Sequence, residues 1–373
     1  MDKNHWEIII IGGGLAGLIA AHQLSKAGKD VLLIEKKQYP FHRVCGEYIS
    51  NEVRDFLIKE NLYPSDIEPA EITKFRLTSV TGRPAEMDLD LGGFGVSRYY
   101  LDEFLYNKAC SIGTTFLLQT QAEDVSFISQ EDIFEVKLQG GDIIYGKHVL
   151  GAFGKRSKID KQFQRDFMKT KSPFIGVKYH VRVEYPQDMV ALHNFEGGYC
   201  GINRIEEGKF NLCYLGSREQ LRAFGNIPEM ERQVLHKNPH LKAIFENSDF
   251  LFDKPEVINE INFSPKNPVE NHVLMIGDAA GLITPLCGNG MAIAIHTGKL
   301  AADTILQSRD RLSIEKKYSQ LWNNHFKKRL WIGRKVQWLF GSQMVSSLSV
   351  NLMRHSEFVA GKIMENTHGT RVT

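Results

Sequence analysis

The first sixty residues alternate between apolar runs and a glycine-rich turn. Residues 6–11, WEIIII, are rich in β-branched side chains and predict a buried strand. The glycine-rich stretch 12–17, GGGLAG, comes next, and apolar positions at helical spacing then continue until Gly28. A second apolar run, 31–34, ends in Glu35. The pattern predicts a strand, a tight turn, a helix and a second, parallel strand.

The same order of elements returns near the other end of the chain. Residues 273–276 form an apolar run, and a Gly-Asp pair, a glycine-rich turn and a helix of small residues follow up to residue 306. Between these segments, alternating apolar and polar positions in 73–96 and 170–265 predict the strands of one antiparallel sheet. We therefore predict an α/β fold with a Rossmann-like domain, an inserted and mainly antiparallel β-sheet domain, and a C-terminal helical segment.

The composition is that of a globular protein with a substantial core. Of the 373 residues, 42% are apolar and 24% are charged. The formal net charge of +2 gives no overall attraction for nucleic acid, so we expect no nucleic-acid partner. We find no charged start followed by an apolar segment and a cleavage site, and we expect neither a secretion signal nor a spanning helix.

The cysteines and histidines suggest neither a disulfide framework nor a metal site. The five cysteines are scattered, odd in number and never in a C-x-x-C pair: Cys45, Cys110, Cys200, Cys213 and Cys287. The 13 histidines show no metal-ligand spacing, and we assign no metal. Free thiols fit a reducing compartment, so we expect a cytoplasmic protein.

Four residues of the first segment each have a physical task in dinucleotide binding. Gly12 allows the tight turn, Gly14 lets the backbone approach a pyrophosphate, and Gly17 lets the helix meet the sheet. Glu35, at the tip of the next strand, accepts a hydrogen bond from a ribose hydroxyl. A G-x-G-x-x-G sequence alone is weak evidence, but here the strand, the helix and the acid are all in place. We predict that these residues bind a dinucleotide.

The segment near the C-terminal end indicates which dinucleotide. Its Gly-Asp pair and the following turn resemble the GD motif of the p-hydroxybenzoate hydroxylase-like flavoproteins. The resemblance implies that the cofactor is FAD and that Asp278 contacts its ribityl chain. In the same resemblance, a helix N-terminus that would stabilise the anionic reduced flavin lies at the P-x-x-G-x-G element with Pro285, Gly288, Asn289, Gly290 and Met291.

Two arginines are further candidates for FAD binding. Residues 96–105, VSRYYLDEFL, resemble the R-x-x-L-D-x-x-L helix of this family, in which the arginine lies near FAD, and the matching residue is Arg98. The alternative for Arg98 is a surface arginine in the first turn of a helix. Arg43 is the second candidate, because a planar guanidinium suits a cofactor phosphate.

One motif departs from the family pattern. Residues 151–157, GAFGKRS, are similar to the motif G-A-D-G-x-x-S, whose acid helps to hold cofactors that include NAD(P)H. Phe153 stands where that acid is expected. The loss of one polar contact leaves FAD binding possible. The electron donor is therefore open between NAD(P)H and a separate reductase or ferredoxin-like partner.

The thiol in RVCGEYIS indicates a branch of the family. GGGLAG, the CGE that follows the second strand, and GDAAG together resemble the geranylgeranyl reductase branch, which also includes hydroxylases and, more distantly, flavin halogenases. In isoprenoid-saturating members, a K-x-C-G loop places its cysteine beside the substrate cavity, and here the loop reads Arg43-Val44-Cys45-Gly46. Cys45 is therefore our catalytic candidate, as a proton donor or as a small wall of the pocket. The alternative is a buried cysteine that acts as a compact hydrophobe.

The middle of the chain favours hydroxylation. Reductases and halogenases of this branch carry tryptophan signatures such as Y-x-W-x-F-P, whereas residues 197–215 keep Tyr199 and contain neither tryptophan nor proline. Hydroxylation needs fewer dedicated side chains. We therefore expect an FAD-dependent monooxygenase that acts on an apolar, phenolic or polyketide-like molecule. The alternatives are a geranylgeranyl reductase-like enzyme that saturates polyprenyl double bonds, and a non-catalytic flavin-binding or electron-transfer protein.

We predict the following division of the chain. The FAD-binding domain takes 1–72, 97–165 and 266–310, the substrate domain takes 73–96 and 166–265, and the C-terminal helical region takes 311–373. Within this last region, the stretch 316–335 has seven basic residues, interleaved aromatic residues and no acid. Such a segment either makes a peripheral contact with an anionic bilayer or packs on the FAD-binding domain with a solvated basic face, and we favour the second alternative.

Overall fold

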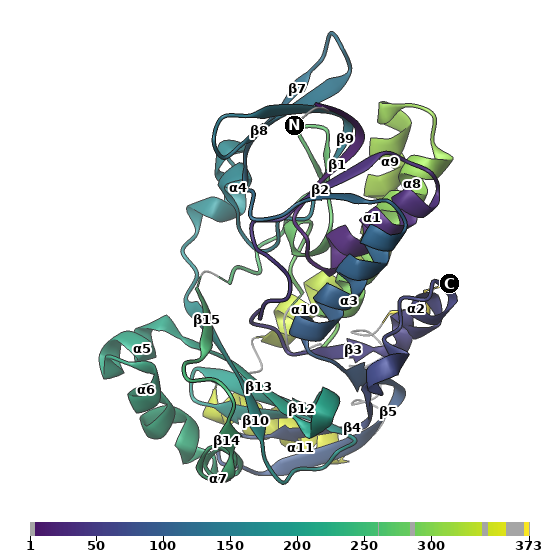
Figure 1. Cartoon of the computed structure of the whole chain (residues 1–373). Helices are drawn as coiled ribbons and strands as arrows, with labels where there is room; N and C mark the ends of the chain where they lie inside the picture. Colours follow the sequence, from purple (N-terminus) through teal and green to yellow (C-terminus); the bar gives the residue numbers. More distant parts are fainter. Residues whose placement is uncertain (1–3, 260, 284–287, 338–341, 356–368, 373) are drawn as a thin grey trace.

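Two β-sheets form the framework of the molecule, and helices flank both of them (Figure 1). The structure is a computed structural model that describes residues 4–259, 261–283, 288–337, 342–355 and 369–372. The predicted α/β fold with an inserted, mainly antiparallel sheet and C-terminal helices is confirmed.

The first sheet has a parallel centre. Its strands are β1 (His5–Ile11), β2 (Val31–Ile34), β6 (Thr115–Leu117), β7 (Ala122–Ile128), β8 (Ile133–Leu138), β9 (Ile143–Gly151), β16 (Val269–Glu270) and β17 (Val273–Met275). Five of them run parallel in the order β17-β9-β1-β2-β6. The central strand β1 is buried on both faces at Ile8, Ile9 and Ile10, which explains its continuous apolar run.

The second sheet is mainly antiparallel. It comprises β3 (Tyr48–Ser50), β4 (Ala70–Thr78), β5 (Pro84–Gly95), β10 (Phe174–Arg182), β11 (Met189–Phe195), β12 (Gly198–Arg204), β13 (Phe210–Ser217), β14 (Asp249–Phe250) and β15 (Glu256–Asn259). β4 and β11 pair in parallel. The chain first enters this sheet at β3, which pairs with β5 and lies inside the segment 1–72 that we assigned to the FAD-binding domain.

Helices cover both sheets. Those beside the first sheet are α1 (Leu15–Lys26), α3 (Arg98–Ser111), α4 (Lys158–Gln162), α8 (Gly290–Gln307) and α9 (Arg311–Trp322), while the short α2 (Arg54–Lys59) follows β3. The second sheet carries α5 (Arg218–Phe224), α6 (Ile227–Val234) and α7 (Pro239–Asn247). The sequence analysis did not predict these three, although Asn226 and Asn238 cap α6 and α7 and a proline follows closely in each.

The C-terminal region joins the two parts. After α9, a π-helical turn at 323–327 leads into α10 (Lys328–Gln337), and Trp322, Phe326 and Leu330 are buried in the core of the first sheet. The basic segment therefore packs on the core of the first sheet. The following helix, α11 (Gln343–His355), packs on β4 and β5 (Figure 1). Among the helices that the structure describes, none is both long enough and apolar enough to span a bilayer.

Candidate functional site

A cavity of about 770 Å³ lies between the two sheets. Residues at the carboxyl ends of four parallel strands line one side of it, namely the ends of β1, β2, β9 and β17. Ligands of open α/β sheets bind at this edge of the sheet. The face of the second sheet forms the opposite wall.

The glycine-rich turn has the geometry that dinucleotide binding requires. Gly12 adopts φ +113°, which favours glycine, and a Cβ atom on Gly17 would lie 2.1 Å from the Gly12 carbonyl oxygen. A Cβ on Gly14 would meet only the Arg98 side chain, at 3.7 Å, so the backbone beside Gly14 is open to the cavity. Glu35 accepts a hydrogen bond from the Gly13 amide at 2.8 Å.

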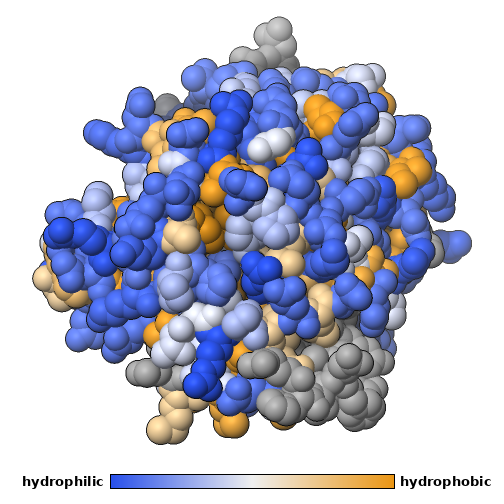
Figure 2. Space-filling model, turned by 90° about the horizontal axis from the view of Figure 1, so that it is seen from below, coloured by the Kyte–Doolittle hydropathy of each residue, from blue (hydrophilic) through white to orange (hydrophobic). Residues whose placement is uncertain are grey.

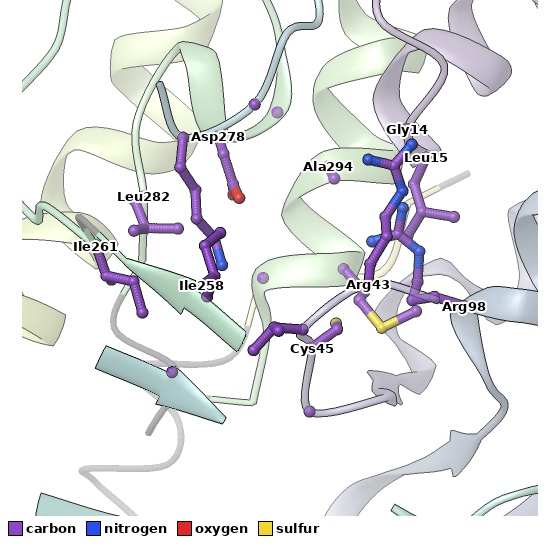
Figure 3. Close-up of a pocket in the computed structure, with 18 of the residues that line it drawn as sticks. Gly14, Leu15, Arg43, Cys45, Arg98, Ile258, Ile261, Asp278, Leu282 and Ala294 are labelled. Carbon is purple, nitrogen blue, oxygen red and sulfur yellow. The ribbon is translucent and has the colours of Figure 1, made fainter. Parts of the chain in front are cut away.

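Two arginines lie beside this turn (Figure 3). Arg98 donates to both carboxylate oxygens of Asp102, at 2.6 and 2.7 Å, and Arg43 donates to the same carboxylate at 3.0 Å. Arg43 also reaches Glu35 at 3.2 Å. Asp102 is fully buried, so one carboxylate fixes both guanidinium groups. Burial opposes the charge of Arg98, but Asp102 and the neighbouring Cys45 raise the pKa of Arg98 above its ordinary value.

The second predicted motif lies across the cavity. The Asp278 side chain is on the opposite side of the cavity from the two arginines (Figure 3). Lys266 donates to the backbone carbonyls of Asp278 and Lys155, at 2.8 and 2.9 Å, and thereby ties the Gly-Asp pair to the turn after β9. Burial lowers the pKa of Lys266 to about 8.

The N-terminus of α8 also lies at the cavity. α8 begins at Gly290, and Gly288, Gly290 and Met291 line the cavity. Asn289 is buried and does not line it. Gly17 packs against the backbone of Gly12 and does not line the cavity either. Pro285 falls outside the described residues.

Cys45 lies in an irregular loop, residues 43–47, that joins the two halves of the site. Its thiol is half-buried, lines the cavity and interacts with the Arg98 side chain. Cys213 on β13 is a second cavity thiol, and burial together with the nearby Cys45 raises its pKa to about 12. Within the described part of the chain, no group of three or more side chains is arranged to hold a metal ion.

The second sheet gives the cavity an apolar wall. Tyr199, which the sequence analysis singled out, is buried there. Met353 of α11 reaches the same space from the C-terminal region. The other large apolar side chains of this part of the cavity are Phe75, Leu77, Leu89, Val190, Leu192, Leu215, Ile258, Ile261 and Leu282.

Several residues of the site were not anticipated. Asp102 belongs to the quoted R-x-x-L-D pattern, and Glu47 directly follows Cys45 and Gly46, so both stood inside motifs. Lys178 and His180 lie on β10 and face the 43–47 loop. Two polar residues at alternate positions of an otherwise apolar strand were the available signal.

The residues of the cavity fit FAD. The open backbone at Gly14, the two arginines beside it and the acid at the end of β2 suit the phosphates and the ribose of a dinucleotide. The helix N-terminus at Gly290 is placed to face a flavin ring. This end-to-end arrangement can hold a flavin against an apolar chamber.

Comparison with known proteins gives relatives that include two reductases. The chain is 27% identical over 333 residues to the digeranylgeranylglycerophospholipid reductase of Methanosarcina acetivorans, which covers 84% of this chain and 79% of that protein. It is 24% identical over 325 residues to the menaquinone reductase of Mycobacterium tuberculosis, with 82% and 77% covered.

Solved structures share the fold. A geranylgeranyl bacteriochlorophyll reductase-like protein from Thermoplasma acidophilum matches with a TM-score of 0.77 and 20% identity, over 98% of this chain and 96% of that one. PqsL of Pseudomonas aeruginosa, described as a probable FAD-dependent monooxygenase, matches with a TM-score of 0.73 and 16% identity, over 92% and 99%.

A family model agrees with the geometry of the cavity. The model described as "FAD binding domain" matches residues 5–305, from β1 to the last turns of α8. This range includes the glycine-rich turn, both arginines, Cys45 and the Gly-Asp pair. The chain is an FAD-dependent oxidoreductase of the FAD binding domain family.

Proposed function

We propose that this protein reduces carbon–carbon double bonds of an isoprenoid lipid. The observation that carries the proposal is the meeting of a thiol, a flavin site and a large apolar chamber in one cavity. The names of the relatives support it, since one is a geranylgeranyl lipid reductase and another a menaquinone reductase. The sequence-based preference for a monooxygenase has support only from more distant structural neighbours.

The apolar wall fits a hydrocarbon chain. Aliphatic and aromatic side chains from six strands and from α11 line the apolar part of the cavity. Exclusion of water from this part favours an isoprenoid chain and leaves a polar headgroup outside. The wall lacks the tryptophan of the Y-x-W-x-F-P signature, and of that signature Tyr199 is the residue that this chain keeps.

Saturation of a double bond requires two electrons and two protons. When FAD is bound and reduced, it supplies a hydride to one carbon. Cys45 lies on the flavin side of the chamber and is the group that we assign to hold a proton, at Sγ, for the other carbon. Arg98, next to the thiol, stabilises the sulfur after the proton has left.

The electron donor is NAD(P)H or a separate protein in this proposal. Phe153 lines the cavity in the turn after β9, where the related motif has an acid. Lys155 and Arg156 follow it and also line the cavity. A cationic turn of this kind suits an anionic donor of either class.

We propose that the protein takes its lipid substrate from an anionic bilayer, whose surface it contacts peripherally. Lys327, the last residue of the π-helical turn, is exposed, as are Lys328, Trp331 and Lys335 of α10. The Lys335 ammonium lies 5.7 Å from the Trp331 ring centroid. Exposed apolar residues occur among hydrophilic ones on the underside of the molecule (Figure 2). Met344, Leu348 and Leu352 form an exposed stripe along α11.

Product analysis tests the function. FAD-loaded protein is supplied with a chemical reductant, without oxygen, and with a geranylgeranyl phospholipid or menaquinone, and the extracted lipid is examined by mass spectrometry. We expect the addition of two hydrogen atoms for each double bond reduced. A lipid or phenolic substrate that gains an oxygen atom, and does so only when oxygen is admitted, would instead establish the monooxygenase. No product under either condition would favour a non-catalytic flavoprotein.

A further inference from the structure

The loop that carries Cys45 is fastened to the second sheet by side chains. Lys178 donates to the Arg43 carbonyl at 3.2 Å, and Asn211 donates to the carbonyls of Cys45 and Gly46, at 3.2 and 2.9 Å. Asn203 donates to the carbonyl of Glu47 at 3.3 Å. Four of the five carbonyls of residues 43–47 are therefore bound by the opposite sheet.

The register of the second sheet creates this polar strip. His180 is paired with Asn211, and Asn211 is paired with Asn203, so the three residues form one row across β10, β13 and β12. Lys178 lies two residues before His180 on the same face of β10. Beyond the next row the face becomes apolar at Leu215. The sheet thus presents a polar strip to the loop and an apolar wall to the chamber.

Glu47 is the centre of the attachment. Its side chain is fully buried and accepts from Lys178 at 2.5 Å and from His180 at 2.7 Å. It also accepts from the backbone amide of Arg98 at 2.7 Å. Burial alone would raise the pKa of Glu47, but Lys178 and His180 outweigh burial and lower it to about 2.

The backbone of Glu47 is itself unusual. Its φ of +53° lies in the left-handed region, which costs a non-glycine residue free energy. A buried ion pair and a strained residue next to a cavity thiol persist only where the surroundings hold them in place. Because Glu47 also holds the amide of Arg98, it links the Cys45 loop to the guanidinium that the thiol contacts.

We propose that Glu47, locked by Lys178 and His180, is the positioning residue that holds the Cys45 thiol against the flavin side of the cavity. This inference rests on the proposed function for its catalytic meaning. The placement of the thiol can be measured without any substrate.

The first test replaces the charged pair by neutral groups of similar size. Glu47→Gln combined with Lys178→Met leaves no unpaired charge in the interior, and such replacements are often tolerated. Cys45 alkylation by iodoacetamide is followed in the FAD-loaded protein by peptide mass spectrometry, which separates Cys45 from the exposed Cys110. We expect the alkylation rate to rise at least about tenfold, the factor that corresponds to about 1.4 kcal/mol of lost loop stability.

A second variant and a matched control complete the test. Asn211→Leu removes only the two hydrogen bonds to the Cys45 and Gly46 carbonyls. If the double variant does not fold, the Cys45 alkylation rate of Asn211→Leu tests whether this attachment positions the thiol. Glu52→Gln with Arg329→Met neutralises another buried ion pair, whose partners lie 3.1 Å apart, and it should leave the alkylation rate unchanged.

Turnover gives the functional readout. In the double variant we expect kcat for lipid reduction to fall while KM stays near the wild-type value, because the chamber is intact. Wild-type alkylation rates in both the double variant and Asn211→Leu would overturn the positioning role. If the variants are alkylated faster but the wild-type protein reduces no lipid, the positioning role of Glu47 stands and only the proposed function is refuted.

Discussion

At the scale of single residues, one buried carboxylate organises the cationic side of the cavity. Asp102 binds Arg98 through two hydrogen bonds and Arg43 through one, and both guanidinium groups lie beside the glycine-rich turn. Arg43 also contacts Glu35, the acid at the ribose position. A pyrophosphate at this turn would therefore meet two cations whose orientation is already fixed.

Asp102→Asn should weaken FAD binding. An asparagine side chain has only one acceptor oxygen and carries no charge, so the hydrogen bond from Arg98 Nε to Asp102 Oδ1 is lost and a donor group faces Arg98 instead. Both arginines also lose their shared counter-charge and are held less firmly. We expect the Kd for FAD to rise by about ten- to a hundredfold, which corresponds to about 1.4 to 3 kcal/mol. Fluorescence titration of the apoprotein measures this change. An unchanged Kd would remove Asp102 from the cofactor site, and Asp55→Asn, at an exposed ion pair, is the control.

A buried histidine should make stability depend on pH. His193 is fully buried between Thr78 and Tyr185, and burial, with His240 and Arg76 nearby, lowers its pKa from 6.5 to about 3. The unfolded chain then binds more protons than the folded one below pH 6.5. The contribution of neutral His193 is full above pH 6.5 and is lost as the pH falls toward 3.

Thermal unfolding tests this dependence. We expect Tm to decrease steadily below pH 6.5 in the wild type and less steeply in His193→Gln. The full difference between the two pKa values corresponds to about 5 kcal/mol at most. His148 and His296, whose pKa values burial also lowers, should retain part of the slope. Equal slopes in the wild type and the variant would contradict this account of His193.

At the scale of elements, what the sequence predicted well was local. The turn after β1 follows from residues a few positions apart, since Gly12 needs its positive φ and Gly17 its close approach to the Gly12 carbonyl. The start of α8 at Gly290 follows from the same kind of signal. Short-range backbone geometry leaves a readable trace in the residue types.

Long-range pairings could not be read in this way. Glu47 meets Lys178 across 131 residues and His180 across 133, and only the packing of the 43–47 loop on β10 brings the partners together. The early strand β3 was missed for a similar reason, because its partner β5 lies more than forty residues later. Motifs located the flavin side of the site, while the sheet that holds the Cys45 loop required the fold.

The turn between β1 and α1 offers a paired test of element and ligand. Gly14→Ala should fold normally, because its Cβ would meet only the Arg98 side chain, at 3.7 Å. It should nevertheless bind FAD at least about tenfold more weakly, because the methyl group would occupy the space through which the pyrophosphate approaches the backbone. Gly17→Ala should instead lower Tm, because its Cβ would lie 2.1 Å from a backbone oxygen.

Spectra of bound flavin and thermal unfolding separate the two variants. Normal FAD content in Gly14→Ala would place the pyrophosphate elsewhere. A Gly17→Ala protein with unchanged Tm would mean that the helix and the turn can move apart at little cost.

At the scale of the whole molecule, the chain uses its two sheets for different tasks. The carboxyl ends of the parallel strands and the start of α8 form the cofactor side of the cavity. The face of the second sheet holds the loop that carries Cys45 and also forms the apolar wall. The C-terminal region spans both, since α10 packs on the first core and α11 closes on β4 and β5. The two sheets therefore bound the cavity from opposite sides.

Filling the chamber should separate substrate binding from cofactor binding. Val190 on β11 lines the apolar wall and is only partly buried, so Val190→Trp adds volume mainly to the cavity. We expect lipid reduction to fall by about tenfold or more while the FAD content and Kd stay at wild-type values. Leu312→Trp, at a residue that is 74% exposed, controls for the added indole. Equal loss of FAD in Val190→Trp would show that flavin, and not lipid, occupies this part.

The central claim is that reduced flavin and an isoprenoid double bond meet in this cavity. The most direct measurement is to reduce the FAD-loaded protein chemically in the absence of oxygen, mix it rapidly with a geranylgeranyl phospholipid and follow the visible absorbance of the flavin. We predict that the lipid alone reoxidises the flavin, with one double bond saturated for each flavin, and that Cys45→Ala slows this step sharply. Flavin that stays reduced in the presence of geranylgeranyl lipid and menaquinone, and is reoxidised only by oxygen, would contradict the account.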